Sequence, residues 1–280
     1  VFIVTHRIAE LVRISDKATV MRDGKDVGVL EKKDLNEKNL IGLMTGRAET
    51  GEKSKSIAVQ TKTDKVVMRA ENLVVWPESK PVNFEVKRGE IVGVTGLDGN
   101  GQDDFVKILA GVQEAHGGTT EILDTNENFT KYSSLENAKK NGISFVSGDR
   151  KKEGILPNLS IYENLVVPLY KKTSRAGFLG FIDWLELNGI FEWEVDRLSI
   201  KTGPRDNLIG SLSGGNQQKV MIARSFAQHP KVLILNDPAR GIDVSTKRDL
   251  YVHLRNHVEE GNTVIFLSSE LEEFIGLCPK

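Results

Sequence analysis

Short apolar runs bounded by polar residues recur along the chain and predict strands that are buried on both faces. Val1–Val4, Glu90–Val94 and Val232–Leu235 have this character, and Val1–Val4 is expected to be a buried parallel strand. Residues 66–90 combine a strand-like stretch with an alternating one, which predicts an antiparallel element. Together these patterns predict an α/β fold with a mostly parallel core sheet.

The first 65 residues differ in pattern from the rest of the chain. Ala18–Leu30 predicts a hairpin, because Asp23-Gly24 can supply the positive φ angles of a tight turn. A short helix is predicted over Asn36–Thr45. Residues 47–65 are polar and charged without helical periodicity, so we expect a linker there.

The two ends of the chain resemble each other. Residues 1–17 and 264–280 each read as an apolar strand, a small hydroxyl residue and a helix with acidic positions; Thr5 aligns with Ser268 and His6 with Ser269. Two generic strand–helix units would explain this pattern. A tandem protein would explain it as well, with residues 1–46 ending one copy and 66–280 forming most of a second, so that the chain is a fragment of something longer.

Composition narrows the class of protein. The chain has 280 residues, of which 39% are hydrophobic and 28% charged, as in ordinary globular proteins. The net charge of −1 provides no overall positive field to attract nucleic acid, so we expect no nucleic-acid partner. The single cysteine, Cys278, excludes an internal disulfide, and no apolar run approaches the length of about 20 residues that spans a bilayer.

A glycine-rich loop follows the strand Glu90–Val94 and precedes a helix predicted over Phe105–Ala110. Strand, glycine loop and helix form a phosphate cradle, in which backbone N–H groups and the helix dipole face the anion. The P-loop pattern GxxxxGK[ST] is only partly present, because glutamine replaces its lysine and aspartate its hydroxyl residue. The residues expected to contact a nucleotide here are Gly96, Gly99, Gly101, Gln102, Asp103 and Asp104.

A second motif lies further along the chain. The string LSGGNQQK at Leu212–Lys219 precedes a helix, and the apolar strand Val232–Leu235 follows and ends at Asn236 and Asp237. Ligands bind at the carboxyl ends of strands in open α/β sheets. We therefore expect this helix N-terminus and these two side chains to belong to a binding site.

These motifs resemble the ATP-binding cassette ATPases of ABC transporters, and most closely the tandem-cassette ATPases that import simple sugars and nucleosides. The resemblance implies a P-loop ATPase fold with a parallel core sheet, an antiparallel β subdomain and a helical subdomain at about residues 155–210. It identifies the signature motif at Leu212–Lys219, a D-loop around Asp243 and a variant Q-loop at Gly148–Gly154. It covers 1–46 as the tail of a first cassette and 66–280 as most of a second.

The resemblance implies a second cassette that has lost its own catalytic groups. Gln102 and Asp103 stand at the lysine and hydroxyl positions, Asn236 at that of the metal-binding aspartate, and the shorter Asp237 at that of the general-base glutamate. Two further positions are lost as well, the switch histidine to Ser269 and the Q-loop residue to Gly148. No Mg²⁺ ligand is therefore expected here, and ATP hydrolysis by this chain alone should be negligible.

The signature, by contrast, is intact. By the resemblance, two cassettes close head to tail, and this signature serves the ATP and Mg²⁺ held by a first cassette, on the same polypeptide or a dimer mate. His6, the switch residue of that first cassette, would contact the same γ-phosphate. The remaining residues expected to bind the nucleotide from this side are Ser213, Gly214, Gly215, Gln217 and Asp243.

The same resemblance places the protein peripherally on the cytoplasmic face of the membrane. Its partners would be membrane permease subunits and, indirectly, a substrate-binding protein. Two alternatives remain, a soluble ABC factor and a regulatory pseudo-ATPase.

The sequence offers two weaker features. His253 and His257 are spaced as a metal pair but are interpreted as a solvated helix face. Five aromatics are interpreted as core of the helical subdomain or as contact with a membrane partner: Phe178, Phe181, Trp184, Phe191 and Trp193.

Overall fold

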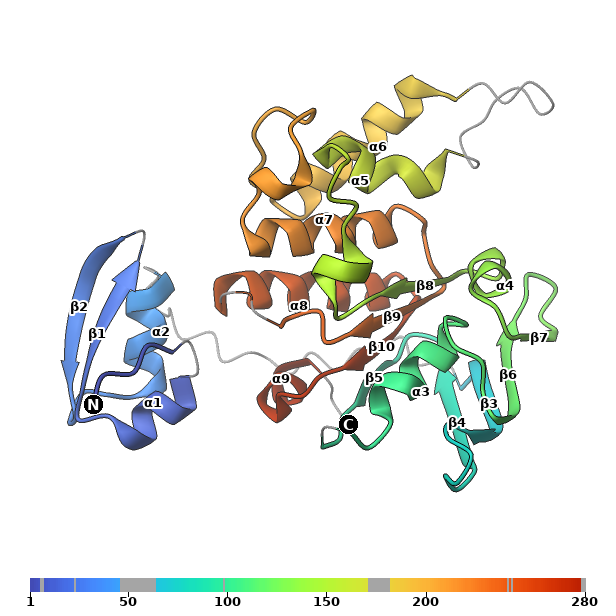
Figure 1. Ribbon diagram of the computed structural model, residues 1–280, viewed down its shortest axis with the longest axis horizontal. Helices are drawn as coiled ribbons and strands as arrows, with labels where there is room; N and C mark the ends of the chain where they lie inside the picture. The colour runs from blue at the N-terminus through green and yellow to red at the C-terminus, as the bar shows by residue number, and fades with distance from the viewer. Residues whose placement is uncertain are drawn as a thin grey trace. The chain divides into compact units, whose positions relative to one another are not determined.

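The computed structural model describes the chain except residues 6–7, 23, 46–63, 98, 171–181, 241, 243 and 278–280. Two compact units emerge, one within residues 1–57 and the other formed by most of residues 58–280. The linker expected at 47–65 lies almost wholly outside the described residues, as do Phe178, Phe181 and Cys278. Figure 1 shows the elements of each unit.

The smaller unit contains a hairpin and two helices. Its elements are α1 (Ile8–Ile14), β1 (Lys17–Arg22), β2 (Lys25–Glu31) and α2 (Glu37–Thr45). The predicted hairpin is confirmed, since β1 pairs antiparallel with β2 and Gly24 has a φ of +75°. The predicted helix is confirmed as α2. A small core of four buried side chains holds these elements together: Ala18, Val20, Leu35 and Leu40.

The buried strand expected at Val1–Val4 is wrong. These residues form no strand, and Phe2 and Val4 are fully exposed. A strand of this composition is stable only between neighbouring strands that hydrogen-bond to it, and no described strand pairs with this segment.

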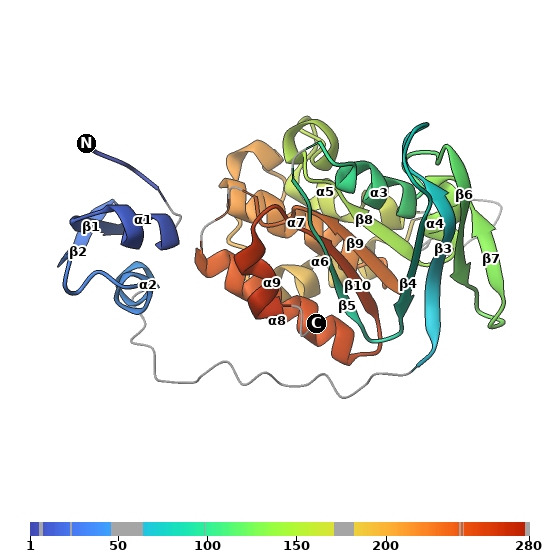
Figure 2. The same cartoon turned by 90° about the horizontal axis from the view of Figure 1, so that it is seen from below.

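Two four-stranded sheets form the frame of the larger unit (Figure 2). The parallel sheet has the order β5-β10-β9-β8, and the antiparallel sheet the order β4-β3-β6-β7, which confirms the predicted α/β architecture. The parallel strands are β5 (Ile91–Val94), β8 (Ile143–Val146), β9 (Val232–Asn236) and β10 (Thr263–Leu267). The antiparallel strands are β3 (Val66–Val74), β4 (Val82–Lys87), β6 (Gly117–Leu123) and β7 (Phe129–Tyr132).

Helices cover both faces of the parallel sheet, which explains its uninterrupted apolar strands. Helix α3 (Gln102–Leu109) packs between the two sheets, where Val232 and Ile234 face it. Leu233 and Leu235 point to the opposite face and contact the other helices. The remaining helical segments are α4 (Leu135–Lys140), the π-helix η1 (Arg150–Gly154), α5 (Ile161–Val166), η2 (Val167–Leu169), α6 (Trp184–Arg197), η4 (Ile209–Ser211), α7 (Gly214–Phe226), α8 (Val244–Glu259) and α9 (Leu271–Leu277).

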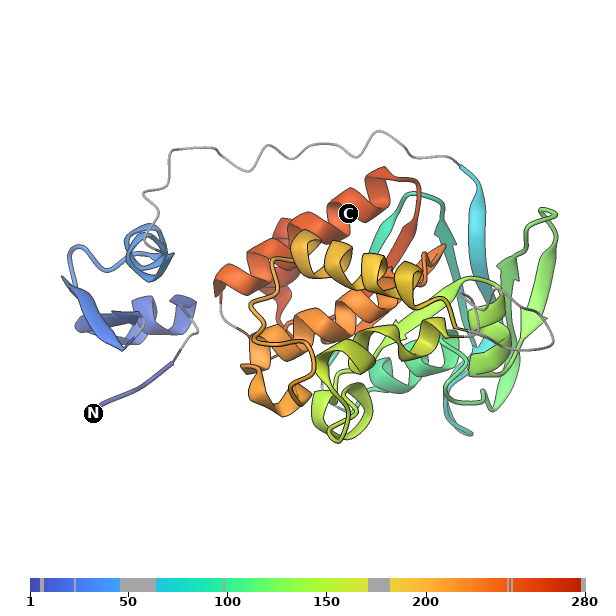
Figure 3. The same ribbon diagram turned by 90° about the horizontal axis from the view of Figure 1, so that it is seen from above.

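Between residues 155 and 211 the described helices are joined by turns and irregular segments, and no strand longer than an isolated bridge is present among the described residues, as expected for a helical subdomain. Figure 3 shows α6, α7 and α8 side by side. Phe191 on α6 is 3% exposed and belongs to the core. Trp184 and Trp193 are 54% and 65% exposed, so the core interpretation is wrong for these two. Within the described part of the chain, no helix has both the length and the hydrophobicity to cross a bilayer.

Candidate functional site

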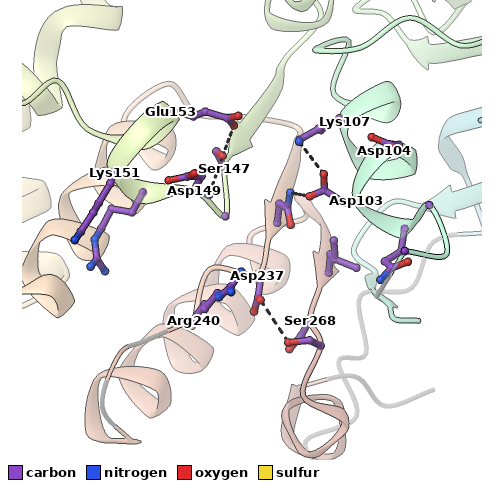
Figure 4. Close-up of a pocket in the computed structure, with 18 of the residues that line it drawn as sticks. Asp103, Asp104, Lys107, Ser147, Asp149, Lys151, Glu153, Asp237, Arg240 and Ser268 are labelled. Carbon is purple, nitrogen blue, oxygen red and sulfur yellow. Dashed lines mark hydrogen bonds and ion pairs between the residues drawn. The ribbon is translucent and has the colours of Figure 1, made fainter. Parts of the chain in front are cut away.

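The loops that follow the parallel strands meet at one edge of the sheet. In the register of the sheet, Leu267 at the end of β10 lies beside both Val94 and Asn236. Side chains after β5, β8, β9 and β10 therefore converge on an open cleft of about 810 Å³, shown in Figure 4. Its described lining is Trp76, Gly99, Gly101, Gln102, Asp103, Asp104, Lys107, Ser147, Gly148, Asp149, Arg150, Lys151, Glu153, Gln218, Asn236, Asp237, Arg240, Leu267, Ser268 and Ser269.

The predicted strand, glycine loop and helix occur in this order. Gly99 and Gly101 have φ angles of +85° and +87°, which L-residues rarely adopt, so glycine is required for the curl of the loop. The helix α3 begins at Gln102, three residues before the predicted start at Phe105. Gly96 does not line the cleft.

Gln102 is turned into the loop. Its Nε2 donates to the carbonyl oxygens of Leu97 at 3.0 Å and Gly96 at 3.4 Å. Its Oε1 is buried and has no hydrogen-bond partner among the described residues. The amide therefore hydrogen-bonds the backbone of its own loop, where a lysine would direct a positive charge at a phosphate.

Asp103 joins α3 to the end of strand β9. Its Oδ1 accepts from Asn236 Nδ2 at 2.5 Å, and its Oδ2 lies 2.7 Å from Lys107 Nζ one turn further along α3. Partial burial opposes ionisation of this carboxyl, but the hydrogen bonds from Lys107 and Asn236 outweigh it and lower its pKa. Asp103 is therefore a carboxylate that already has two donors.

Sequence analysis did not identify Trp76 as part of the site. Its Nε1 donates to Asp104 Oδ2 at 2.8 Å, and its ring lies against Gly101, where an added Cβ would be only 3.2 Å away. The indole is 39% exposed and lines the cleft. An aromatic face beside a phosphate cradle can stack on a base. The available signal was a large aromatic residue directly before Pro77, in a loop after a strand.

Asp237, the expected weak base, follows strand β9. It has a φ of +44°, an unfavourable conformation for a residue with a side chain. Burial raises the pKa of its carboxyl, and the nearby Glu273 raises it further. Ser269 Oγ donates to Asp237 Oδ2 at 3.4 Å, so the serine at the expected switch position does reach the residue at the expected base position.

Gly148 has no space for a side chain. A Cβ there would lie 2.9 Å from the backbone oxygen of Asn236, which is closer than real Cβ contacts allow. The segment after it is the π-helix η1, which is tied to α7 at two points. Arg150 Nη1 donates to the carbonyl oxygen of Gly214 at 3.2 Å, and Arg224 Nη2 donates to that of Gly154.

The first residues of the signature motif lie outside the lining of the cleft, whereas Gln218 near its end lines the cleft. Helix α7 begins at Gly214, and Ser213 is its N-cap, with Oγ accepting from Asn216 Nδ2 at 3.0 Å. Ser213 is exposed, and neither it nor the two glycines Gly214 and Gly215 line the cleft. Gln217 Nε2 donates to Leu212 O at 3.0 Å, so its amide supports the backbone that enters the helix.

The histidine pair on α8 is not a solvated face, which corrects the interpretation from sequence. His257 is 3% exposed and its ring packs 5.0 Å from that of Phe226 on α7. Burial, with Arg197 nearby, lowers the pKa of His257 to about 4. The described residues contain no group of three or more potential metal-binding side chains. His6 and Asp243 lie outside the described residues.

Comparisons with known proteins agree with this geometry. Residues 79–240 match the ABC transporter family. The chain is 34% identical over 280 residues to the uncharacterized ABC transporter ATP-binding protein YphE of Escherichia coli K12, covering 100% of this chain and 54% of that protein. It is 34% identical over 277 residues to the ribose import ATP-binding protein RbsA of Lactococcus lactis subsp. cremoris, covering 99% of this chain and 54% of the relative. The chain thus spans about half the length of these curated relatives.

A solved structure shows the same fold. The crystal structure of a nucleotide-free ATP-binding cassette from an ABC transporter superposes with a TM-score of 0.63 at 17% identity. The match covers 76% of this chain and 85% of that one. The glycine-rich loop, the cleft at the sheet edge and the family match over more than half of the chain lead to one conclusion: the chain belongs to the ABC transporter family.

Proposed function

We propose that this chain is part of the ATP-binding subunit of an ABC importer for simple sugars or nucleosides. In this proposal, residues 66–280 form a degenerate second cassette that binds ATP weakly and supplies its signature to the hydrolytic site of a first cassette. Residues 1–46 are the end of that first cassette, and 47–65 the linker. The import function named for the relative RbsA supports the proposal, as do the residues of the site.

The observation that carries the proposal is the separation of the two anion-binding features. The Ser213 corner is formed by Ser213, Gly214 and Gly215 at the start of α7. Ser213 is exposed and the two glycines are partly exposed, and none of the three lines the cleft beside the glycine loop. A helix N-terminus presents N–H groups and positive dipole to an anion. The corner and the cleft therefore suit two different nucleotides, one bound by each cassette.

The cleft itself supports weak ATP binding. Its volume of about 810 Å³ is sufficient for a nucleotide, and the indole of Trp76 can stack on the base. The described lining nevertheless contains five acidic residues (Asp103, Asp104, Asp149, Glu153 and Asp237) against four basic ones (Lys107, Arg150, Lys151 and Arg240). A polyphosphate gains little net attraction from such a set, and Gln102 contributes no charge.

In the assembled transporter, the cassette would lie peripherally on the cytoplasmic face of the membrane. The segment Gly148–Gly154 and helix α5 would pass cassette closure to the permease, and a substrate-binding protein would act through the permease. The hydrogen bonds from Arg150 to Gly214 and from Arg224 to Gly154 support this role, because they connect the segment to α7, the helix that begins at the Ser213 corner.

The test is ATP turnover with and without a first cassette that has an intact P-loop. The chain alone should show negligible turnover, far below the rate of about 1 per second seen in slow enzymes. Mixed with the intact cassette it should restore hydrolysis, and Ser213→Ala should lower that activity at least about tenfold, equivalent to about 1.4 kcal/mol of barrier.

Ser211→Ala is the matched control, since Ser211 is exposed two residues earlier and its Oγ donates only to Leu208 O within the described chain. Loss of the Ser213 cap should cost only about 1 kcal/mol of stability, so the variant remains folded. Absence of any rescue by the wild-type chain would favour the regulatory pseudo-ATPase. Failure to fractionate with membranes that contain the permease would favour the soluble factor.

A further inference from the structure

The positions that the family resemblance assigns to Mg²⁺ ligands are bonded to each other. Asn236 presents its Nδ2 to Asp103 Oδ1 at 2.5 Å, and the other carboxylate oxygen lies 2.7 Å from Lys107 Nζ. Mg²⁺ requires oxygen ligands at about 2.0–2.1 Å in near-octahedral geometry. Here N–H donors approach both oxygens of the one carboxylate, so these residues do not fit Mg²⁺.

Lys107 supplies a positive charge at the same place. It is the only basic residue of α3, the helix that begins at the glycine loop, and its side chain is 24% exposed and lines the cleft. The charged groups near it are Asp103, Glu153 and Asp104. Glu153 already accepts from Ser147 Oγ at 2.6 Å, and Asp104 accepts from Trp76. An ammonium has three donors, and the contact with Asp103 accounts for one of them.

The residue at the P-loop lysine position does not compete for this role. Gln102 directs its Nε2 to the carbonyl oxygens of Leu97 and Gly96, so its donors are used within the loop. In Figure 4, the side chain of Lys107 points toward Asp103. Asn236 Nδ2 donates to the other oxygen of the same carboxylate.

We propose that the cleft binds a nucleotide di- or triphosphate without Mg²⁺, and that the ammonium of Lys107 takes the place of the metal. The ammonium contacts the phosphate oxygens while Asp103 and Asn236 hold it at the start of α3. This inference rests on the proposed function, since it concerns the weak nucleotide site of the same cassette.

The test is equilibrium binding of ATP to the chain by calorimetry, in excess Mg²⁺ and in excess EDTA. The dissociation constants should agree within about threefold, whereas a metal-assembled site would bind at least tenfold more tightly with Mg²⁺. Lys107→Met should weaken binding in EDTA at least tenfold. Lys140→Met is the matched control, because Lys140 is exposed, forms an i, i+4 ion pair with Glu136 on α4 and does not line the cleft. The affinity of this variant for ATP should not change.

A second measurement uses the unaltered protein, so its result does not depend on whether a variant folds. In the presence of ATP, the protein should retain no more Mn²⁺ than ATP alone, as followed by the spin-resonance signal of free Mn²⁺. Asp103→Ser combined with Asn236→Asp should gain Mn²⁺ retention.

Three results would overturn the inference: affinity that requires Mg²⁺, unchanged affinity in Lys107→Met, or no ATP binding in either condition. Rescue of hydrolysis that depends on Ser213 would still stand in those cases. Failure of this inference is therefore distinguishable from failure of the proposed function.

Discussion

At the scale of single residues, the cleft already contains many hydrogen bonds of its own, although Oε1 of Gln102 has no partner among the described residues. The side chains that stand where catalytic groups are expected bond to one another or to the backbone, as Gln102 does to Leu97 and Asp103 does to Asn236. Such bonds satisfy polar groups that would otherwise have no hydrogen-bond partner until a ligand binds. The residues at the expected catalytic positions thus form a packed arrangement, and its tightness can be tested at Gly148.

Restoring a side chain at Gly148 should destabilise the protein. In Gly148→Ala the new Cβ would meet the backbone oxygen of Asn236 at 2.9 Å, and a backbone atom cannot move aside cheaply. Crowding of this kind costs about 1–3 kcal/mol. Urea unfolding should show this loss, and Gly148→Gln should be no better, so a glutamine there would not recreate a working Q-loop.

Gly189→Ala is the matched control, because Gly189 lies within helix α6 and a Cβ there would meet no atom within 4 Å. Alanine in a helix interior is favoured over glycine by about 0.8–1 kcal/mol, so this variant should be more stable than the wild type. The expectation would be contradicted if Gly148→Ala kept the wild-type unfolding midpoint while Gly189→Ala raised it. The backbone at the end of β9 would then be able to move away from the added Cβ.

The sequence predicted which residues stand at the expected catalytic positions but not how they are bonded. The pair Asp103 and Lys107 has the i, i+4 spacing of a helical ion pair and was open to prediction. The contact with Asn236 was not, because 133 residues separate the two positions and only the sheet register brings them together. The inward turn of Gln102 likewise depends on the curl of the loop.

At the scale of elements, apolar runs predicted the parallel strands correctly where other strands flank them. β5 and β9 occur where expected, with α3 on one face and α7 and α8 on the other. Val1–Val4 has the same composition and forms no strand, because composition does not supply a neighbour. Helix faces were predicted less well. The face of α8 that carries His257 was interpreted as solvated, but His257 is buried against Phe226 of α7.

The packing of α6 against α7 predicts a pH-dependent stability. Glu194 on α6 has a side chain 2% exposed, with Arg197 Nη1 3.4 Å from its Oε1. Burial raises the pKa of Glu194 from 4.5 to about 7, despite Arg197. Between these two pH values the folded protein holds a proton that the unfolded chain releases, so this group makes stability fall as pH rises from 4.5 to 7.

His257 acts in the opposite direction. Its pKa is lowered from 6.5 to about 4, so the unfolded chain binds the extra proton and this group makes stability fall as pH drops from 6.5 to 4. In the wild type the two effects partly cancel between pH 4.5 and 6.5. In Glu194→Gln the histidine effect remains alone, and stability should rise more steeply with pH over that range.

The free energy of unfolding of Glu194→Gln should exceed that of the wild type most above pH 7, where the wild type holds a buried carboxylate. We expect a difference of roughly 1–3 kcal/mol there. Urea unfolding between pH 5 and 8 measures it. Glu192→Gln is the control, because Glu192 is exposed on the same helix and should leave the pH profile unchanged. Parallel pH profiles for Glu194→Gln and the wild type would contradict the expected burial of the charge.

At the scale of the whole molecule, the described hydrophobic cores divide along the two units. The core of the smaller unit draws its buried residues from Ala18 to Leu40. The two cores of the larger unit draw theirs from Met68 to Leu277, on the two faces of the parallel sheet. Each of these described cores is thus built from residues of a single unit, which predicts that the units unfold separately.

A chain that begins at Asp64 should therefore fold and keep the thermal midpoint of the larger unit. We expect the shift to be below about 2 °C, since a loss of 1 kcal/mol moves the midpoint of a domain of this size by about 2–4 °C. Calorimetry of the full chain should show a second, weaker transition at lower temperature, because a unit of 60 residues has only a small core.

The shortened chain should lose only that lower transition, and its affinity for ATP should not change, because the described lining of the cleft begins at Trp76. A fall of more than about 5 °C in the midpoint of the larger unit, which corresponds to more than about 1 kcal/mol, would contradict this division. It would mean that residues 1–63 stabilise the larger unit directly, and the smaller unit would then be a structural part of the unit that carries the cleft.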